Sequence, residues 1–197
     1  MSKVCFRMAT IDDVKDILAI YEPYILNTPI TFEFNPVPED EFIERINRIS
    51  KQFPYILCVI DDEVAGYAYC SYYLEKEGFS WDCEITVYVA ESFHKRGIAT
   101  ALYKILIPII KQQGYYNIYS LICVPNESSV YLHEKFGFRE VGIYYNTAYK
   151  LAQWRDLLVM GKKLREYELS PKKPISVHEL DKGFVDDLLN DGCDYIK

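Results

Sequence analysis

The residues best placed to do chemistry lie at a polar turn between a strand pattern and a helix pattern. The first turn of a helix carries unpaired N–H groups and a partial positive charge, which suits a bound anion. Small residues there let a phosphate approach the backbone, and basic neighbours add positive charge. The turn comprises His94, Lys95, Arg96, Gly97, Ile98, Ala99 and Thr100. The sequence therefore predicts an anion site. The alternative is an ordinary solvent-facing turn, because the pattern is neither a Walker A loop nor G-x-G-x-x-G.

Hydrophobic periodicity predicts the elements that must position this turn. Strand patterns occupy 3–9, 55–60, 64–73, 81–89, 117–124, 138–149 and 154–164, and helix patterns occupy 11–24, the region around 42–49, 97–114 and 126–136. The order β-α-α-β-β-β-α-β-α-β-β is typical of an α/β (α+β) domain built around one sheet. We expect a single domain with a mixed central sheet of about seven strands flanked by helices.

Local signals predict how these elements begin and end. Thr10 and Asp13 form a capping-box pattern before the first helix. The acidic turn 61–63 between two strand patterns predicts a hairpin. Pro108 should kink or shorten the second half of its helix, and Gly137 should cap the helix that precedes it.

The composition changes after residue 165, which divides the chain into an expected domain at 1–165 and a C-terminal extension at 166–197. In the extension, Ser176 and Glu179 form a second capping-box pattern. Apolar residues then recur at helical spacing, namely Val177, Leu180, Phe184 and Leu188. This pattern predicts a short amphipathic helix that folds back on the domain or onto a partner subunit.

Bulk composition disfavours several classes of function. The 197 residues carry a formal net charge of -7, which disfavours binding to nucleic acid. The six cysteines form no C-x-x-C pair, which favours buried thiols over a metal site or a disulfide framework. The N-terminus has no signal-peptide pattern, and the longest apolar run, Ile105–Ile110, is too short to span a bilayer. We therefore expect a cytoplasmic protein with no membrane partner.

The arrangement around the turn resembles the GNAT superfamily of N-acetyltransferases. A strand, a basic turn, a Gly-x-Ala step, a long helix and another strand are followed by Pro125-Asn126-Glu127-Ser128-Ser129 and Leu132-His133-Glu134-Lys135-Phe136-Gly137-Phe138. The usual superfamily pattern at the turn is Gln/Arg-x-x-Gly-x-Gly/Ala. Here His94 occupies the first position, which removes one side-chain contact and leaves the backbone amides in place.

Further motifs are similar to the phosphinothricin and methionine sulfoximine acetyltransferases within that superfamily. They are Asn27-Thr28, Thr31-Phe32-Glu33, Glu84 before Thr86-Val87-Tyr88-Val89, His133, and Tyr149-Lys150 before Trp154-Arg155-Asp156-Leu157. The likeness covers roughly residues 3–163. It implies acetyl-CoA as co-substrate, no metal, a small-molecule amine as acceptor and a homodimer.

The resemblance also assigns the coenzyme contacts. It implies that the turn 94–100 holds the coenzyme A pyrophosphate. The backbone of Val87, Tyr88 and Val89 would bind the pantetheine arm, and one of these N–H groups could polarise the acetyl carbonyl. Asn126 and Ser129 are expected to be further contacts. Asn126 could equally be a helix N-cap, and the two roles are compatible.

Two residues are candidates for acid–base catalysis. An alkylammonium cannot attack a thioester until a base accepts a proton, and the motif match assigns this role to Glu84. A surface or ion-paired carboxylate is the alternative. In the resembled group a histidine at the position of His133 is regarded as a catalytic partner, and imidazole titrates near neutrality. A core or helix-capping histidine is equally compatible with the sequence.

The acceptor is less well defined by the sequence. Related enzymes that act on amino-acid analogues carry an arginine where this chain has Leu74, which disfavours a doubly anionic substrate. The residues expected to line the acceptor site are Phe32, Tyr73, Leu74, Lys76, Ile85 and Thr86.

The sequence thus predicts an acetyl-CoA-dependent N-acetyltransferase that acetylates the primary amine of an amino acid or amino-acid analogue by direct transfer in a ternary complex. Two alternatives remain open. One is a non-catalytic coenzyme A-binding module, and the other is a protein or peptide N-acetyltransferase.

Overall fold

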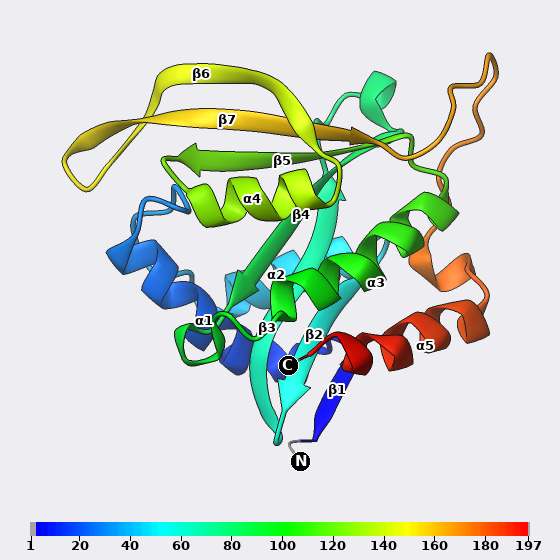
Figure 1. Ribbon diagram of the computed structural model, residues 1–197, viewed down its shortest axis with the longest axis horizontal. Coiled ribbons are helices and arrows are strands. Elements are labelled where there is room, and N and C mark those ends of the chain that lie inside the picture. The colour runs from blue at the N-terminus through cyan, green and yellow to red at the C-terminus, as the bar shows by residue number, and fades with distance from the viewer. Residues whose placement is uncertain (1–2, 197) are drawn as a thin grey trace.

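The computed structural model describes residues 3–196, which form a seven-stranded sheet flanked by helices (Figure 1). The strands are β1 (Val4–Met8), β2 (Tyr55–Ile60), β3 (Glu63–Tyr72), β4 (Asp82–Val89), β5 (Asn117–Val124), β6 (Arg139–Lys150) and β7 (Gln153–Lys163). The helices are α1 (Val14–Asn27), α2 (Glu39–Ser50), α3 (Ile98–Gln113), α4 (Glu127–Lys135) and α5 (Lys182–Asp191). Short 3-10 segments are η1 (Ile11–Asp13), η2 (Glu77–Phe79), η3 (Glu91–Phe93), η4 (Val177–Glu179) and η5 (Gly192–Tyr195). The predicted fold class and the predicted order of elements are confirmed.

The strands lie in the order β1-β2-β3-β4-β5-β7-β6. Neighbouring strands are antiparallel except for β4 and β5, which are parallel. A parallel pair needs a crossover connection, and here α3 supplies it. The sheet is therefore mixed, with its parallel pair at the centre, and the basic turn lies between β4 and α3.

Helices cover both faces of the sheet. In Figure 1, α3, α4 and α5 lie on the near side of the strands and α2 lies behind them. Helix α3 contacts β2, β3 and β4. Its apolar residues are almost fully buried, including Leu102, Ile105 and Leu106. This burial on the central strands holds the start of α3, and with it the basic turn, at the end of β4.

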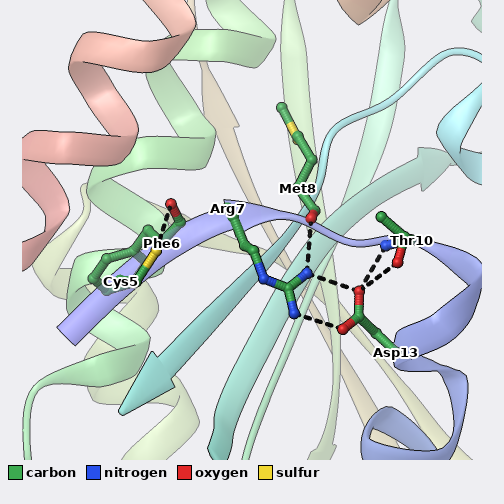
Figure 2. Close-up of polar contacts among 6 residues, drawn as sticks. All are labelled: Cys5, Phe6, Arg7, Met8, Thr10 and Asp13. Carbon is green, nitrogen blue, oxygen red and sulfur yellow. Dashed lines mark hydrogen bonds and ion pairs between the residues drawn. The ribbon is translucent and has the colours of Figure 1, made fainter. Parts of the chain in front are cut away.

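The junction between β1 and α1 is fixed by one buried carboxylate (Figure 2). Arg7 donates two hydrogen bonds to Asp13, at 2.8 and 2.6 Å. The backbone N–H and the hydroxyl of Thr10 donate to the same carboxylate at 2.8 and 3.0 Å. The predicted capping box is confirmed. The Arg7 guanidinium and these hydrogen bonds hold the pKa of Asp13 below its ordinary value.

The predicted hairpin is also confirmed. Strands β2 and β3 pair antiparallel, and Ile60 lies opposite Glu63. Asp61 and Asp62 have φ values of 51° and 66°. Positive φ at both central residues is the geometry of a tight two-residue hairpin turn.

Of two expectations about helix ends, one needs correction and the other is confirmed. Helix α3 continues through Pro108 to Gln113, so the expectation of a shortened second half is wrong. Proline leaves one carbonyl without its helical donor, but burial of Ile109 and Ile110 beyond it offsets this loss. The prediction that Gly137 caps α4 is confirmed: the helix ends at Lys135, and Gly137, with φ 80°, donates its N–H to the Glu134 oxygen at 2.9 Å. The glycine is needed where the backbone becomes left-handed.

The C-terminal extension packs against the domain. Its second capping box is present, but it closes only the single turn η4, and the Asp181 side chain caps α5 instead. Helix α5 buries Val185 and Leu189, whereas the predicted Phe184 and Leu188 are only half-buried. All four residues of the predicted apolar pattern pack against the core, although α5 begins after Asp181 and not at Ser176. Contacts with β1 and α3 fold the extension back on its own domain.

Among the described cysteines, Cys58, Cys70, Cys83 and Cys123 are buried as expected, whereas Cys5 is exposed. Cys5 lies on β1, where its side chain alternates with the buried Phe6. None of the helices described for residues 3–196 is long and apolar enough to cross a membrane.

Candidate active site

The parallel strands β4 and β5 separate after a short paired segment. Among the described residues they pair only from Asp82 to Glu84 on β4 and from Asn117 to Tyr119 on β5. Strand β4 remains paired with β3 up to Val89. The rest of β4 therefore has one edge facing a gap, where its backbone groups are available to a ligand.

A cavity of about 280 Å³ lies at this gap. Residues 84–88 of β4 and 120–123 of β5 form two of its walls. Helix α4 and its N-cap contribute Asn126, Ser129 and His133, and the loop after α1 contributes residues 30–32. The structure thus brings together Phe32, Glu84, Ile85, Thr86, Val87, Tyr88, Asn126, Ser129 and His133 from the residues that the sequence singled out.

Glu84 lies where the two strands begin to separate. Its backbone pairs with Ser71 on β3 and with Tyr119 on β5. Within residues 3–196 its carboxylate has neither a hydrogen bond nor an ion pair to another side chain. Burial raises the pKa of Glu84 to about 7. A carboxyl group with this pKa and no competing partner can accept a proton near neutral pH and release it again.

His133 lies across the cavity on α4 and is 3% exposed. Its Nδ1 is 2.7 Å from the backbone oxygen of Ser129, and its Nε2 is 3.0 Å from the hydroxyl of Tyr103 on α3. Burial lowers the pKa of His133 below its ordinary value. The imidazole is therefore neutral at pH 7 and hydrogen-bonded through both nitrogens.

The basic turn enters α3 through a left-handed glycine. Gly97 is the N-cap of α3 with φ 88°, in the left-handed region that favours glycine. Lys95 is exposed, and the guanidinium of Arg96 lies 4.9 Å from the ring of Phe93. His94 turns back toward the sheet, with Nε2 3.0 Å from the oxygen of Val89. The hydroxyl of Tyr24 donates to the same oxygen at 2.6 Å, so these two side chains fix the end of β4.

Aromatic side chains hold the loop at the opposite end of the cavity. The hydroxyls of Tyr21 and Thr31 are 2.7 Å apart, and Tyr21 packs edge-on against Tyr88 with ring centroids 4.9 Å apart. The buried Lys150 on β6 donates to the backbone oxygen of Thr31. These contacts come from three separate elements and fix the segment that carries Phe32.

Several predicted residues lie outside this cavity. Tyr73 stacks on Tyr119 with centroids 4.4 Å apart. Leu74 is 46% exposed, and Lys76 is an exposed residue preceding η2. Val89 and the turn 94–100 are not part of the cavity wall either. A role for any of them in ligand binding stays a prediction.

Sequence reasoning did not single out several other residues that line the cavity, among them Tyr21, Tyr69, Tyr103 and Cys123. Tyr103 is fully buried in the apolar face of α3, so its spacing was that of a core residue. The only available signal was its hydroxyl, which must find a partner when buried. Among residues 3–196 no cluster of three or more His, Cys, Asp or Glu side chains could hold a metal ion.

Comparison with known proteins gives a consistent result. The acetyltransferase (GNAT) domain family matches residues 6–159. A phosphinothricin N-acetyltransferase of Streptomyces coelicolor is 34% identical over 79% of this chain and 94% of its own. A protein of the same name from Streptomyces viridochromogenes is 29% identical over 86% of this chain and 91% of its own.

The fold is also similar to solved structures. A GNAT superfamily phosphinothricin acetyltransferase from Sinorhizobium meliloti, solved in complex with AcCoA, has a TM-score of 0.83 and 27% sequence identity. The similarity covers 87% of this chain and 95% of that one.

Proposed function

This chain belongs to the GNAT acetyltransferase family and is an N-acetyltransferase, and we propose that it transfers the acetyl group of acetyl-CoA to the primary amine of an amino acid or amino-acid analogue. One observation carries the proposal. Glu84, with a pKa of about 7 and no partner among the described residues, lines a cavity beside the free edge of β4. This is the arrangement that amine acetylation requires.

The coenzyme has two features of the chain to bind. The turn 94–100 offers the N-terminus of a 16-residue helix, a left-handed glycine and the exposed Lys95 to the pyrophosphate. The gap between β4 and β5 offers the backbone of Val87 to the pantetheine arm, and at Val89, whose oxygen is bound by Tyr24 and His94, it offers the N–H. Asn126 caps α4 by accepting a hydrogen bond from Ser129 at 3.2 Å, which leaves its amide N–H₂ for a further contact.

Proton transfer assigns the central role to Glu84. The acceptor arrives as an ammonium ion, and its nitrogen gains a lone pair only after losing a proton. Glu84 accepts this proton, directly or through one water molecule. Because its pKa is about 7, roughly half of the enzyme has an ionised Glu84 at neutral pH. A carboxyl group with an ordinary pKa would be ionised in nearly every molecule at neutral pH, but its carboxylate would be a much weaker base.

Direct transfer is favoured over an acetyl-enzyme. Cys123 is the thiol in the cavity wall, and a covalent route would need its thiolate. The side chain is only 3% exposed, and burial raises the pKa of its thiol. A thiol that stays protonated is a poor nucleophile. We therefore propose that amine and acetyl-CoA react in a ternary complex.

The acceptor site favours a substrate with little negative charge. No Lys or Arg side chain belongs to the cavity wall within the described residues, and the position of the expected arginine is filled by the exposed Leu74. Lys150 lies nearby, but its ammonium group is bound to the Thr31 oxygen. We propose an amino acid or a related monoanionic amine rather than a doubly anionic one.

We also propose a homodimer. The hairpin of β6 and β7 exposes large aromatic side chains, with Tyr144, Tyr145 and Trp154 each at least 60% exposed. Exposed apolar surface of this kind is typical of an interface. Light scattering of the purified protein tests this proposal, and a monomer at micromolar concentration would contradict it. Cytoplasmic location stays a prediction from the sequence.

The coenzyme site is tested with Gly97→Ala. A side chain at φ 88° is strained by roughly 1–2 kcal/mol, and its Cβ would lie 3.0 Å from the backbone oxygen of Tyr195. We expect the turn to relax out of the shape that holds the pyrophosphate, so that coenzyme A binds about tenfold more weakly. Calorimetry measures this affinity. Gly78→Ala is the matched control, because Gly78 has no positive φ and no heavy atom within 4 Å of an added Cβ. Failure of the parent protein to bind coenzyme A would overturn the proposed function.

The acceptor is tested by following thiol release from acetyl-CoA with amino acids, methionine sulfoximine, phosphinothricin and polyamines. We expect release with at least one monoanionic amino acid and a lower kcat/KM with phosphinothricin. Coenzyme binding without turnover of any amine would support a non-catalytic coenzyme-binding module instead.

A further inference from the structure

Part of the basic turn is backbone that needs support from its surroundings. Lys95 and Gly97 have φ values of 64° and 88°, and a lysine at positive φ is disfavoured because its Cβ crowds the backbone. Such backbone persists only where neighbouring groups hold it in place. On the sheet side, His94 and Tyr24 both contact the oxygen of Val89. On the other side, the contact comes from the C-terminal extension.

The extension reaches the basic turn through Tyr195. A Cβ added at Gly97 would lie 3.0 Å from the backbone oxygen of Tyr195. Tyr195 belongs to η5, which contacts α3 (Figure 1). The ammonium of Lys104, on α3, lies 3.4 Å from the centroid of the Tyr195 ring, which is a cation–π contact. Tyr195 is therefore held beside the first two turns of α3.

The segment that carries Tyr195 is wedged between β1 and α3. Gly192 is buried, and a Cβ there would lie 2.6 Å from Cδ1 of Ile105 and 2.7 Å from a ring carbon of Phe6. The thiol of Cys193 donates to the backbone oxygen of Val4 at 3.3 Å. Only a glycine allows η5 to approach both elements this closely, so the position of η5 is fixed by the domain.

The extension supports the basic turn without occupying it. Within residues 3–196, no backbone N–H of residues 95–100 donates to a backbone oxygen of the extension. The Lys95 side chain is exposed, and the Arg96 guanidinium lies on the ring of Phe93. The groups that suit an anion at the start of α3 therefore stay available while Tyr195 packs on Gly97.

From these contacts, and resting on the proposed function, we propose that Tyr195 is a positioning residue for the coenzyme: it holds the basic turn in the shape that binds the pyrophosphate, so that affinity for coenzyme A depends on the packing of the C-terminal extension. The extension lies beyond residue 159, where the family match ends. The support is thus supplied by a part of the chain outside the matched domain.

The physical basis of the proposal is preorganisation. A turn that is already in its binding shape loses little conformational freedom when the ligand arrives, whereas a relaxed turn must be reordered at the expense of binding energy. Glu84 and the cavity lie on the other side of β4 from the extension's contacts with β1 and α3. Loss of the Tyr195 ring should therefore change coenzyme affinity and leave the chemical step unchanged.

The first test is Tyr195→Ala in the full chain. Coupling between two parts of a protein typically changes an affinity by roughly 5- to 150-fold. Because one side chain is only part of the support, we expect coenzyme A to bind about fivefold more weakly by calorimetry. The KM for acetyl-CoA should rise by a similar factor, and kcat at saturating acetyl-CoA should stay within about twofold of the parent.

Two further variants separate positioning from a general structural effect. Tyr195→Phe keeps the ring that Lys104 contacts and should bind coenzyme A like the parent. Tyr167→Ala is the matched control, because Lys163 lies 4.7 Å from the Tyr167 ring but the tyrosine hydroxyl donates to Asn117, at the opposite end of the sheet from the basic turn. This control should keep the parent affinity.

A second test needs no variant and no turnover. Coupling is reciprocal, so if the packed extension strengthens coenzyme binding, coenzyme A must stabilise the packed extension by the same factor. In hydrogen–deuterium exchange of the parent, saturating coenzyme A should slow exchange of the backbone amides of residues 192–196. The amides of residues 166–170 should exchange at an unchanged rate.

The outcomes are distinct. The inference would be overturned by Tyr195→Ala with the parent affinity, by tighter binding in that variant, or by exchange at residues 192–196 that coenzyme A leaves unchanged. Tighter binding would show that the extension obstructs the coenzyme instead of supporting its site. A parent protein that binds no coenzyme A would instead contradict the proposed function.

Discussion

Two carboxylates of this protein lie in low-dielectric surroundings, and their pKa values are shifted in opposite directions. Asp13, between β1 and α1, accepts four hydrogen bonds from Arg7 and Thr10, and these interactions lower its pKa. Glu84, where β4 leaves β5, accepts none among the described residues, and burial raises its pKa to about 7. The first is stabilised as an anion. The second is poised between anion and acid.

The comparison separates a structural carboxylate from a functional one. Desolvation penalises the charged form of both groups. At Asp13 the hydrogen bonds and the guanidinium outweigh this penalty, so ionisation stabilises the fold. At Glu84 nothing outweighs the desolvation penalty. Ionisation of Glu84 therefore costs stability, and the raised pKa makes its carboxylate a stronger base. A carboxylate that is buried without partners is therefore a better sign of catalysis than burial alone.

The largest expected effect is on turnover by Glu84→Gln. Removing a general base typically lowers the rate by roughly 100- to 10,000-fold, so kcat should fall by at least about 100-fold while coenzyme affinity is retained. In the parent, kcat/KM should rise with pH through a midpoint near 7, and this limb should be absent from any residual activity of the variant. The control Glu63→Gln changes an exposed carboxylate on β3 and should keep the parent kcat. Unchanged turnover in Glu84→Gln would remove the residue from the mechanism.

The next effect is on stability through Asp13→Ala. Breaking a fully buried ion pair costs roughly 3–5 kcal/mol of folding stability. Because the Arg7 side chain is 42% exposed, we expect a smaller loss of about 2 kcal/mol. Urea unfolding measures the loss, and kcat should be unchanged at 25 °C. Because the folded pKa of Asp13 is lowered, its contribution is present above the unfolded pKa and should disappear as pH falls through the folded pKa.

Glu166→Ala is the control for that experiment. Its carboxylate pairs with Lys163 at 2.6 Å, but the Glu166 side chain is 93% exposed. Exposed pairs contribute roughly 0–1 kcal/mol, so this variant should be nearly as stable as the parent. An equal loss of folding stability in both variants would contradict the claim that the buried ion pair of Asp13 stabilises the fold more than the exposed pair of Glu166.

A smaller effect should appear in the stability of Glu84→Gln. The folded pKa of Glu84 is raised, so the ionised group destabilises the fold as pH rises from the unfolded pKa toward 7. The variant should therefore be more stable than the parent at pH 8, by roughly 1 kcal/mol after allowing for solvent screening. The difference should vanish near pH 4.5. Thermal unfolding at the two pH values measures this difference. A variant less stable than the parent at pH 8 would show that ionised Glu84, like ionised Asp13, stabilises the fold.

Much of the fold followed from local patterns. The capping box at Thr10 and Asp13, the hairpin at 61–63 and the order of elements are encoded within windows of a few residues, and all are present. The errors occurred where distant contacts override local signals. Pro108 does not shorten α3 because its neighbours are buried against the sheet, and Val185 and Leu189 are the most buried residues of α5 because that helix packs on β1 and α3.

The sequence by itself determined which residue types are available: the glycine of the basic turn, the carboxylate at position 84 and the histidine at 133. Only the tertiary structure decided their states. Desolvation of Glu84 depends on atoms from several elements, and the partner of His133 lies 30 residues away on another helix. Periodicity reports which face of an element is apolar, but burial, hydrogen-bond partners and therefore pKa values arise only when the elements pack together.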